Sequence, residues 1–393
     1  MIAFFGHNVN DAAVARRAAA FQKAGHEVIG YMPRRGPAKP VPWANVDLGE
    51  TFDGAYWQRI KNVRSGFHIT REYKEDLERA TILYARNLDM LALTVTLRRN
   101  LRLKAPIVYE CLDVHHRLTG DALTARMLRR AERAFLKQTS LVVISSPRFA
   151  TEHFRKYYPK VCRTFLIENR LIDVPDLPPR PSPPEHASTG PLRIGWFGNL
   201  RCRRSLDLLL DLARTYPTDI EVTLRGYPAR TVIPDLEGEI EGIPNITFHG
   251  RYEAPKDLEA IYSEVDLVWA GDWYEDEANS VWLLPNRIYE GGYFATPALA
   301  PAGTETARWI AENGAGLLLD SPVETSLPAA ISRLIADRSD ISTMQKKLLN
   351  APRSLFVEEP ELIDRMIETA LGSQSSSDRH SIAATGPGAE TGR

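Results

Sequence analysis

Residues 193–213, RIGWFGNLRCRRSLDLLLDLA, decide the fold class of this 393-residue chain. An apolar run ends at Gly198, and a short basic loop follows it. Leucines then recur with the spacing of one face of a helix, at Leu206, Leu209, Leu210 and Leu212. A buried strand that passes through a short loop into an amphipathic helix is the repeating unit of a parallel α/β sheet.

The same alternation continues on both sides of this unit. In the first half we expect strands at 2–6, 26–32, 81–86, 107–110, 141–146 and 164–169, with helices near 11–24 and 121–138. In the second half we expect strands at 192–198, 220–226, 246–250, 266–271, 296–301 and 315–320, with helices near 205–215, 257–264, 285–294, 303–312 and 326–337. The pattern predicts two doubly wound, Rossmann-like α/β domains that face a cleft at the carboxyl ends of their strands.

The domain boundary lies at residues 173–191, which hold seven prolines and read as an extended linker. It separates an N-terminal domain, 1–172, from a C-terminal domain, 192–355. We expect residues 356–371 to form a helix that returns to the N-terminal domain. Residues 372–393 are poor in bulky apolar side chains, so they are predicted to be a disordered tail.

Composition excludes several classes of protein. The chain has 49 Lys and Arg against 50 Asp and Glu, so a strongly basic nucleic-acid binder is not expected. It has no apolar run of transmembrane length, and its start, MIAFFG, has no signal-peptide pattern. Three scattered cysteines give neither a disulfide framework nor a zinc site, which suits a reducing cytoplasm. The near-zero charge is nevertheless split, with +11 on residues 1–185 and −12 on the rest.

The first strand–helix junction, FFGHNVNDAAVARR at 4–17, carries polar groups toward the cleft. Gly6 permits a tight turn, and Asn10 or Asp11 can cap the helix. We expect ligand contacts from His7, Asn8, Asn10 and, inside the helix, Arg16 and Arg17. The alternative is a plain turn followed by a solvated arginine pair. The GxGxxG dinucleotide fingerprint is absent, which weighs against a nicotinamide oxidoreductase.

A second group follows the strand in IVYECLDVHHRL, 107–118. Asp113 or His115 can act as a general base or orient an acceptor hydroxyl. Alternatively, Asp113 only caps the next helix. His115 and His116 are adjacent and have no further ligands clustered in the sequence, so no metal site is expected.

Two further segments suggest anion and ribose binding. Arg201, Arg203 and Arg204 stand beside the free N–H groups of a helix start, where they can bind phosphate, although they can also form a solvated basic loop. In DEANSVWLLPNRIYEGGYFATPALAP, 276–301, Pro285 suits a first helical turn. Glu290, one turn further, can accept both hydroxyls of a ribose, unless it is only a surface glutamate.

These segments resemble a known family. LPNRIYEGGYFATPALA at 284–300 resembles the LPNKLFEYLAAGxPVL segment of GT-B glycosyltransferases near family 4. FGNLRCRRSLDLL at 197–209 resembles their second-domain opening, and ITFHGRYEAPKDLEAIYSEVDLVWA at 246–270 resembles the run that follows. GHNVNDAAVARR and YECLDVHH are most similar to bacterial exopolysaccharide enzymes of the succinoglycan type.

The resemblance implies roles for individual residues. Glu290 matches the second glutamate of a Glu–x7–Glu pair that holds the donor ribose, whereas the first position is Trp282. Backbone amides at 282–284 would face the diphosphate or the donor sugar. The diphosphate-binding arginine maps to Asn199, where Arg201 can substitute, and the lysine maps to Arg204 or Arg203. The implied donor-binding residues are Gly198, Asn199, Arg201, Arg204, Arg251, Leu284, Asn286, Arg287 and Glu290. The implied acceptor side holds Gly6, His7, Asn8, Asn10 and Arg16, with Asp113 and His115 as catalytic residues.

The implied activity is transfer of a sugar from a nucleotide diphosphate sugar, such as UDP-glucose, to a lipid-linked exopolysaccharide or other surface polysaccharide. No cofactor is expected, because the chain has no Asp–x–Asp and because Arg201, Arg204 and helix N-termini can stabilise the leaving group. The alternative is a non-catalytic nucleotide-sugar-binding module of the same fold. Basic stretches at 96–104 and 125–137 predict peripheral association with the inner face of the cytoplasmic membrane.

Overall fold

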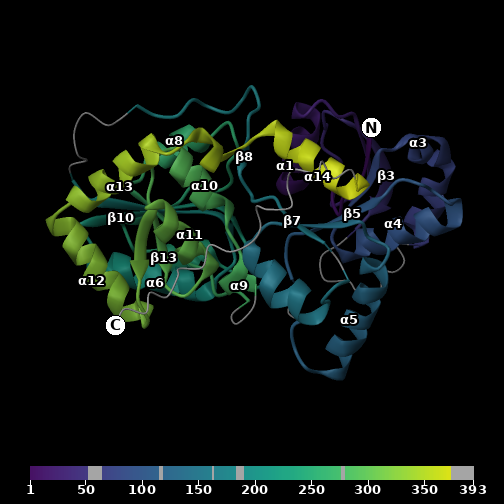
Figure 1. Cartoon of the computed structure of the whole chain (residues 1–393). Coiled ribbons are helices and arrows are strands. Elements are labelled where there is room, and N and C mark those ends of the chain that lie inside the picture. Colours follow the sequence, from purple (N-terminus) through teal and green to yellow (C-terminus); the bar gives the residue numbers. More distant parts are fainter. Residues whose placement is uncertain (52–63, 115–117, 162, 183–189, 276–278, 373–393) are drawn as a thin grey trace, which may run out of the picture.

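A computed structural model describes residues 1–51, 64–114, 118–161, 163–182, 190–275 and 279–372 of the chain (Figure 1). It contains two parallel sheets with helices on both faces, which confirms the predicted α/β class with two doubly wound domains. His115, His116 and the tail expected after 372 lie outside the described residues.

The N-terminal sheet has the order β3-β2-β1-β4-β5-β6-β7, and all of its described pairings are parallel. Its strands are β1 (Ile2–Phe5), β2 (Val28–Arg34), β3 (Ala44–Glu50), β4 (Ile82–Arg86), β5 (Ile107–Cys111), β6 (Leu141–Ile144) and β7 (Thr164–Leu166). The covering helices are α1 (Ala12–Lys23), α3 (Lys74–Arg79), α4 (Leu88–Leu101), α5 (Leu123–Leu136) and the π-helical segment η3 (Phe149–Arg155), with a 3-10 turn at Arg71–Tyr73. The strand order reverses beside β1, and ligands bind at such a reversal.

The C-terminal sheet repeats this arrangement in the order β11-β10-β9-β12-β13-β14. Its strands are β9 (Leu192–Leu200), β10 (Ile220–Pro228), β11 (Ile246–Phe248), β12 (Leu267–Trp269), β13 (Ala298–Pro301) and β14 (Gly316–Leu319). Its helices are α6 (Arg203–Thr215), α7 (Leu236–Ile240), α8 (Leu258–Ser263), α9 (Asn279–Trp282), α10 (Asn286–Tyr293), α11 (Glu305–Asn313), α12 (Val323–Ala336) and α13 (Ser339–Asn350), followed by a 3-10 turn at Arg353–Leu355. The reversal here lies beside β9, whose carboxyl end faces the N-terminal domain.

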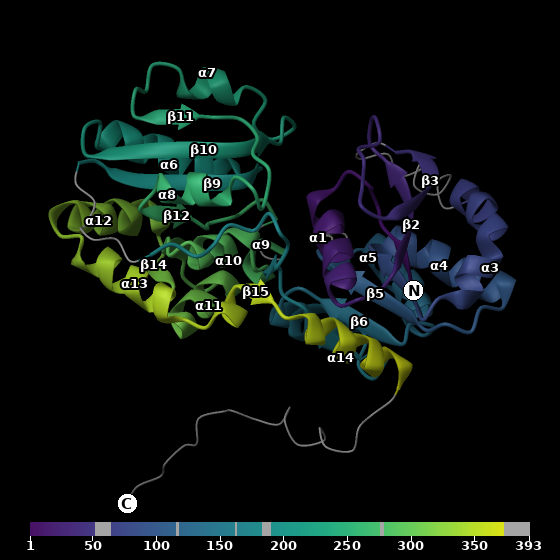
Figure 2. The ribbon, with the colours of Figure 1, turned by 90° about the horizontal axis from the view of Figure 1, so that it is seen from above.

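The chain crosses between the domains twice, and the two crossings run side by side. Strand β8 (Leu171–Ile172) leaves the N-terminal domain and pairs in parallel with β15 (Val357–Glu358), which returns to it. The last helix, α14 (Pro360–Leu371), then packs against α1 in the N-terminal domain (Figure 2). Ile363, Met366 and Ile367 of α14 join the apolar cluster that also holds Val14 and Phe21 of α1.

A buried charge network fixes α1 against the sheet and the returning chain. Arg17 Nε lies 3.1 Å from Glu110 Oε1 on β5, and its Nη1 lies 3.1 Å from Glu358 Oε1 on β15. Arg86 pairs with the second oxygen of Glu110. Burial by itself raises the pKa of Glu110, but the two guanidiniums outweigh it and hold that pKa below its ordinary value. Arg17 is therefore a core residue, and the expectation that it lines the cleft or is solvated is wrong.

Several elements were not predicted, among them strand β3 and the helices α3, α4, α7, α9 and α13. Strand β3 is mostly polar and half-exposed at the sheet edge, so it lacks the apolar run that marks a buried strand. Helix α4, LDMLALTVTLRRNL, is apolar around most of its circumference and has no clear helical stripe. In the helix, the hydroxyls of Thr94 and Thr96 donate to carbonyls one turn back.

Candidate active site

A cavity of about 260 Å³ lies between the two domains. The N-terminal domain contributes Arg16 from α1, Asp113 after β5 and Asn169 after β7. The C-terminal domain contributes the ends of β9 and β12 and the start of α10. The predicted site residues that meet here are Arg16, Asp113, Gly198, Asn199, Arg201, Leu284, Asn286, Arg287 and Glu290.

The start of α10 forms the C-terminal wall of this cavity. Pro285 is the residue before the helix rather than its first turn, and Asn286 and Arg287 follow it into the cavity lining. Arg287 Nη1 donates to the Trp269 carbonyl at 3.2 Å, which fixes its guanidinium against β12. The predicted helix therefore points its N-terminus at the cavity, as an anion-binding helix does.

Glu290 is a buried carboxylate at the cavity, not a surface glutamate. Its side chain is only 4% exposed, and the Tyr262 hydroxyl donates to Oε2 at 3.0 Å. Burial raises the pKa of Glu290 above its ordinary value, although Arg16, Tyr262 and Arg287 act in the opposite direction. A carboxylate left partly unpaired in such a place has capacity to accept hydrogen bonds from ligand hydroxyls.

The end of β9 brings backbone close to the ligand space. Gly198 has a φ of +103° and lines the cavity. A side chain on its neighbour Gly226, on β10, would place a Cβ 1.8 Å from the Gly198 carbonyl oxygen. Gly226 is thus needed for the two strands to run this closely, and Gly198 for its positive φ at the cavity edge.

Only one of the three arginines expected to bind phosphate reaches the cavity. Arg201 does so, held 3.3 Å from Asp272 by an ion pair. Arg203 instead pairs with Asp207 and Glu239. Arg204 lies over the Trp273 ring and pairs with Glu324 on α12, 2.7 Å away. The predicted anion site at α6 is therefore wrong for Arg203 and Arg204, because Asp207 and Glu239 take up the first guanidinium and Glu324 takes up the second.

Arg251 also lies outside the cavity lining. It is exposed and its guanidinium stacks 5.3 Å from the centre of the Tyr227 ring. The next residue, Tyr252, lines the cavity in its place. Tyr252 was not predicted, although an aromatic side chain beside a proposed base-binding position is a signal that the sequence carries.

The polar side chains of the loop after β1 hold the loop itself in place, a role that the sequence did not reveal. Asn8 Oδ1 accepts from the backbone N–H of Asn10 and Arg35, and the Asn10 amide donates to the carbonyls of Arg35 and Pro37. His7 lies beside Asp11, which caps α1. Gly6 faces Met32, whose Sδ would lie 2.8 Å from an added Cβ. The cavity lining contains none of Gly6, His7, Asn8 and Asn10, so of the expected acceptor-side group it contains Arg16 alone.

Asp113 is held by the opposite domain. Asn279 of α9 donates to its Oδ1 at 3.0 Å, while the aspartate itself remains exposed. Its partner in the prediction, His115, lies outside the described residues.

The segment 282–284 is fixed mainly through its carbonyls. The Ser146 hydroxyl donates to the Trp282 carbonyl and Asn169 donates to the Leu284 carbonyl, so both bonds join the two domains. The Leu283 amide already donates to the Asn279 carbonyl at 2.9 Å. The expectation that this amide faces the diphosphate or the donor sugar is therefore wrong.

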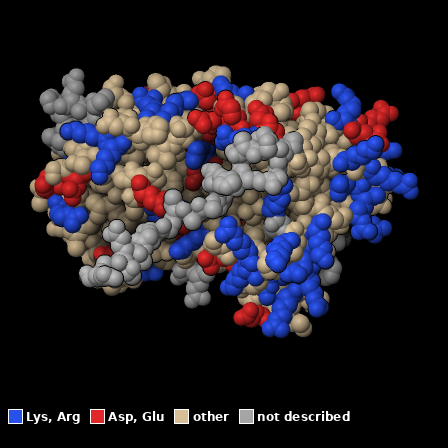
Figure 3. Space-filling view, viewed as in Figure 1, with Lys and Arg blue, Asp and Glu red and all other residues tan. Residues whose placement is uncertain are grey.

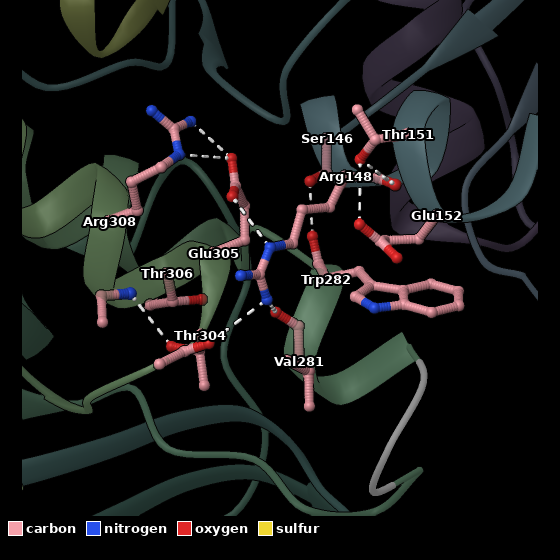
Figure 4. Close-up of polar contacts among 12 residues, drawn as sticks. Ser146, Arg148, Thr151, Glu152, Val281, Trp282, Thr304, Glu305, Thr306 and Arg308 are labelled. Carbon is pink, nitrogen blue, oxygen red and sulfur yellow. Dashed lines mark hydrogen bonds and ion pairs between the residues drawn. The ribbon is translucent and has the colours of Figure 1, made fainter. Parts of the chain in front are cut away.

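Arg148 makes the second set of interdomain contacts (Figure 4). It extends from the loop after β6 and lies 3.6 Å from Glu305 Oε2 at the start of α11. It also donates to the carbonyls of Val281 and Gly303. Glu305 is buried, and Arg308 pairs with its other oxygen. These contacts were not predicted, since no local pattern links residues so far apart.

Within the described part of the chain, no group of three or more His, Cys, Asp or Glu side chains is arranged to hold a metal ion. The helices described there are all too short or too polar to span a bilayer.

The chain was compared with known proteins. No family model matches the chain. The chain is 36% identical over 342 residues to the succinoglycan biosynthesis protein ExoL of Rhizobium meliloti (strain 1021), a match that covers 85% of this chain and 84% of that protein.

Solved structures give the same fold at lower identity. A sucrose-phosphate synthase from Thermosynechococcus elongatus superposes with a TM-score of 0.74 at 15% identity, over 95% of this chain and 99% of that one. Anabaena HepE in complex with UDP-glucose gives 0.70 at 15% identity, over the same shares. WaaG, a glycosyltransferase involved in lipopolysaccharide biosynthesis, gives 0.64 at 13% identity, over 95% of this chain and all of that one. The chain therefore belongs to the family of the succinoglycan biosynthesis protein ExoL and has the GT-B fold of glycosyltransferases.

Proposed function

We propose that the protein is a glycosyltransferase of exopolysaccharide assembly that transfers a hexose from a UDP-sugar to a lipid-linked saccharide. The observation that carries this proposal is the convergence of Glu290, Arg16 and the N-terminus of α10 on one interdomain cavity. Its family membership and the UDP-glucose bound by the structurally similar HepE support the donor class.

In this proposal the donor lies along the C-terminal wall. The Glu290 carboxylate accepts hydrogen bonds from the ribose hydroxyls, and Tyr252 borders the same space. The diphosphate lies between the start of α10, Arg16 and Arg201, where helix N–H groups and guanidiniums offset its charge. Gly198 and Asn199 let the backbone of β9 approach the phosphates.

The chemical step breaks the bond between the sugar and the diphosphate. Negative charge grows on the leaving diphosphate, and Arg16, Arg201 and the α10 dipole are already aimed at it, so little reorganisation is needed. Asp113 stands at the acceptor side of the cavity, where it can take the proton of the attacking hydroxyl. Contacts between the domains exclude water and limit hydrolysis of the donor.

The N-terminal domain, on the acceptor side, also has a surface suited to binding a membrane. Figure 3 shows Lys and Arg gathered over α5, where Arg126, Arg130, Arg133 and Lys137 are exposed. Leu123 and Met127 on this helix are also 73% and 63% exposed. A basic helix that exposes apolar side chains binds an anionic lipid surface. We therefore place the protein peripherally on the inner face of the cytoplasmic membrane.

The proposal is tested with the purified full chain. Calorimetric titration with UDP, GDP and ADP should select UDP, and labelled UDP-glucose should transfer its sugar to a glycolipid extract of exopolysaccharide-producing cells. NMR of the product then gives the linkage. Nucleotide binding without transfer of any UDP-hexose would indicate the non-catalytic binding module, and the absence of nucleotide binding would overturn the proposal altogether.

A further inference from the structure

A second cavity, of about 270 Å³, opens beside the interdomain cavity on the N-terminal side. The two cavities share Asp113 and Arg201 in their linings, so a ligand in one can reach a ligand in the other. The second cavity lies where β4 and β5 end and beneath α5. Its polar lining includes Asn87, Asp89, Glu132 and His153, and Leu118 and Leu128 supply apolar walls.

Glu132 of α5 is the unusual residue of this cavity. It is 1% exposed, although it sits on a helix whose outer face is basic. The Tyr158 hydroxyl donates to Oε2, and His153 Nε2 lies 3.1 Å from the same oxygen. Both partners are buried, and the burial and the nearby carboxylate raise the pKa of Tyr158, so it stays a donor. Two immobile groups therefore fix the orientation of this carboxylate.

The other oxygen of Glu132 is left for a ligand. No described residue donates a hydrogen bond to Oε1, and Glu132 lines the cavity. A buried carboxylate is costly unless its oxygens are hydrogen-bonded. A ligand hydroxyl that donates to Oε1 would meet that need.

The remaining lining favours an uncharged ligand that donates hydrogen bonds. Asp89 at the start of α4 is half-buried and, among the described residues, has no hydrogen bond or ion pair. With Asp113, Glu132 and Glu275 it gives the cavity four carboxylates, whereas its arginine, Arg201, is paired with Asp272. Carboxylates accept from sugar hydroxyls and repel phosphates and uronic acids.

We propose that this cavity binds the terminal, uncharged sugar of the acceptor, and that Glu132 selects it by accepting a hydrogen bond from one of its hydroxyls. This inference rests on the proposed glycosyltransferase function and adds the acceptor class to it. Helix α5 then has two tasks: its inner face holds the sugar, and its basic outer face meets the lipid diphosphate at the membrane. The anionic part of the acceptor is thereby kept out of the acidic cavity.

The test uses ligand-observed NMR on the full chain with methyl β-D-glucopyranoside, methyl β-D-galactopyranoside and methyl β-D-glucuronide. We expect a neutral glycoside to bind about tenfold more tightly than the glucuronide. Glu132→Gln, which cannot accept two charge-assisted bonds, should weaken that binding about tenfold, and Asp89→Asn should weaken it in the same direction. Glu75→Gln on the exposed face of α3 is the matched control and should bind as the unchanged protein does.

UDP titration of each variant separates this inference from the function on which it rests. Unchanged UDP affinity together with weakened glycoside binding supports the acceptor cavity. Should Glu132→Gln fail to fold by thermal melting, Asp89→Asn carries the test, because its side chain has less packing to lose. Equal binding of glucuronide and neutral glycosides, or no effect of either variant, overturns the inference even if UDP binds normally. If the unchanged protein does not bind UDP, the proposed function is refuted instead.

Discussion

Arg16 Nη2 on α1 lies 3.3 Å from Asn286 Oδ1 at the start of α10, across the cavity between the two domains. The two residues are 270 positions apart in sequence and belong to opposite walls. A guanidinium of the acceptor domain is therefore already at the helix terminus where we place the donor diphosphate. One residue thus links domain closure to stabilisation of the leaving group.

Replacing Arg16 should slow transfer more than it weakens donor binding. Arg16→Ala removes a charge aimed at the leaving diphosphate, so we expect kcat to fall about a hundredfold. Steady-state assays with UDP-glucose separate kcat from KM. Arg35→Ala is the control, because it is a change of the same kind on the N-terminal domain but outside the cavity lining. Equal effects of the two variants would show that Arg16 does not act on the leaving diphosphate.

Glu290 should make donor affinity depend on pH. The pKa of this carboxyl is raised by burial, so it takes up a proton at a higher pH than an exposed glutamate does. The protonated form is a poorer acceptor for ribose hydroxyls, so UDP-glucose affinity should fall as pH falls through that raised pKa. Glu290→Gln should bind about tenfold more weakly at neutral pH and lose this dependence. An unchanged affinity in calorimetry would show that the ribose lies elsewhere.

Arg148 should stabilise the packing of the two domains. Arg148→Ala leaves the buried Glu305 with Arg308 as its ion-pair partner. We expect the free energy of unfolding in urea to fall by about 1–2 kcal/mol. Arg155→Ala, an exposed arginine of the same region, should change it far less. A loss no greater than that of the control would mean that solvent compensates the missing contact.

Vesicle binding should depend on the outer face of α5. Arg126→Glu with Arg130→Glu should reduce co-sedimentation with phosphatidylglycerol vesicles at least tenfold, since each basic residue contributes about 1 kcal/mol at an anionic surface. Raising the salt concentration should have the same effect. Arg214→Glu with Lys346→Glu makes the same charge change on the C-terminal domain and should leave binding intact. Binding indifferent to salt and to both pairs would contradict the membrane face.

The fold could be predicted because its signals are local. Each buried strand is an apolar run, and the proline before α10 and the glutamate and glycines within it stand in one stretch of sequence. Contacts between distant residues could not be predicted in this way. Arg17 meets Glu110 and Glu358 only in the folded chain, and Arg204 meets Glu324.

Glu132 illustrates the same limit on a single helix. Its neighbours in sequence are basic and exposed, so the stretch 125–137 was interpreted as a membrane-facing surface alone. Its burial comes from His153 and Tyr158, which belong to the next segment of the chain. An acidic residue isolated within a basic amphipathic helix is the signal that could have been found.

The parallel pairing of β8 with β15 has a mechanical consequence. In topological terms the donor half is an insertion, which leaves the acceptor half after Ile172 and re-enters it at Val357. The two halves are joined by two paired segments of chain rather than by one flexible linker. Any relative movement of the halves must therefore carry both crossings together, and a fragment that stops at residue 172 would leave bare the face of α1 that α14 covers.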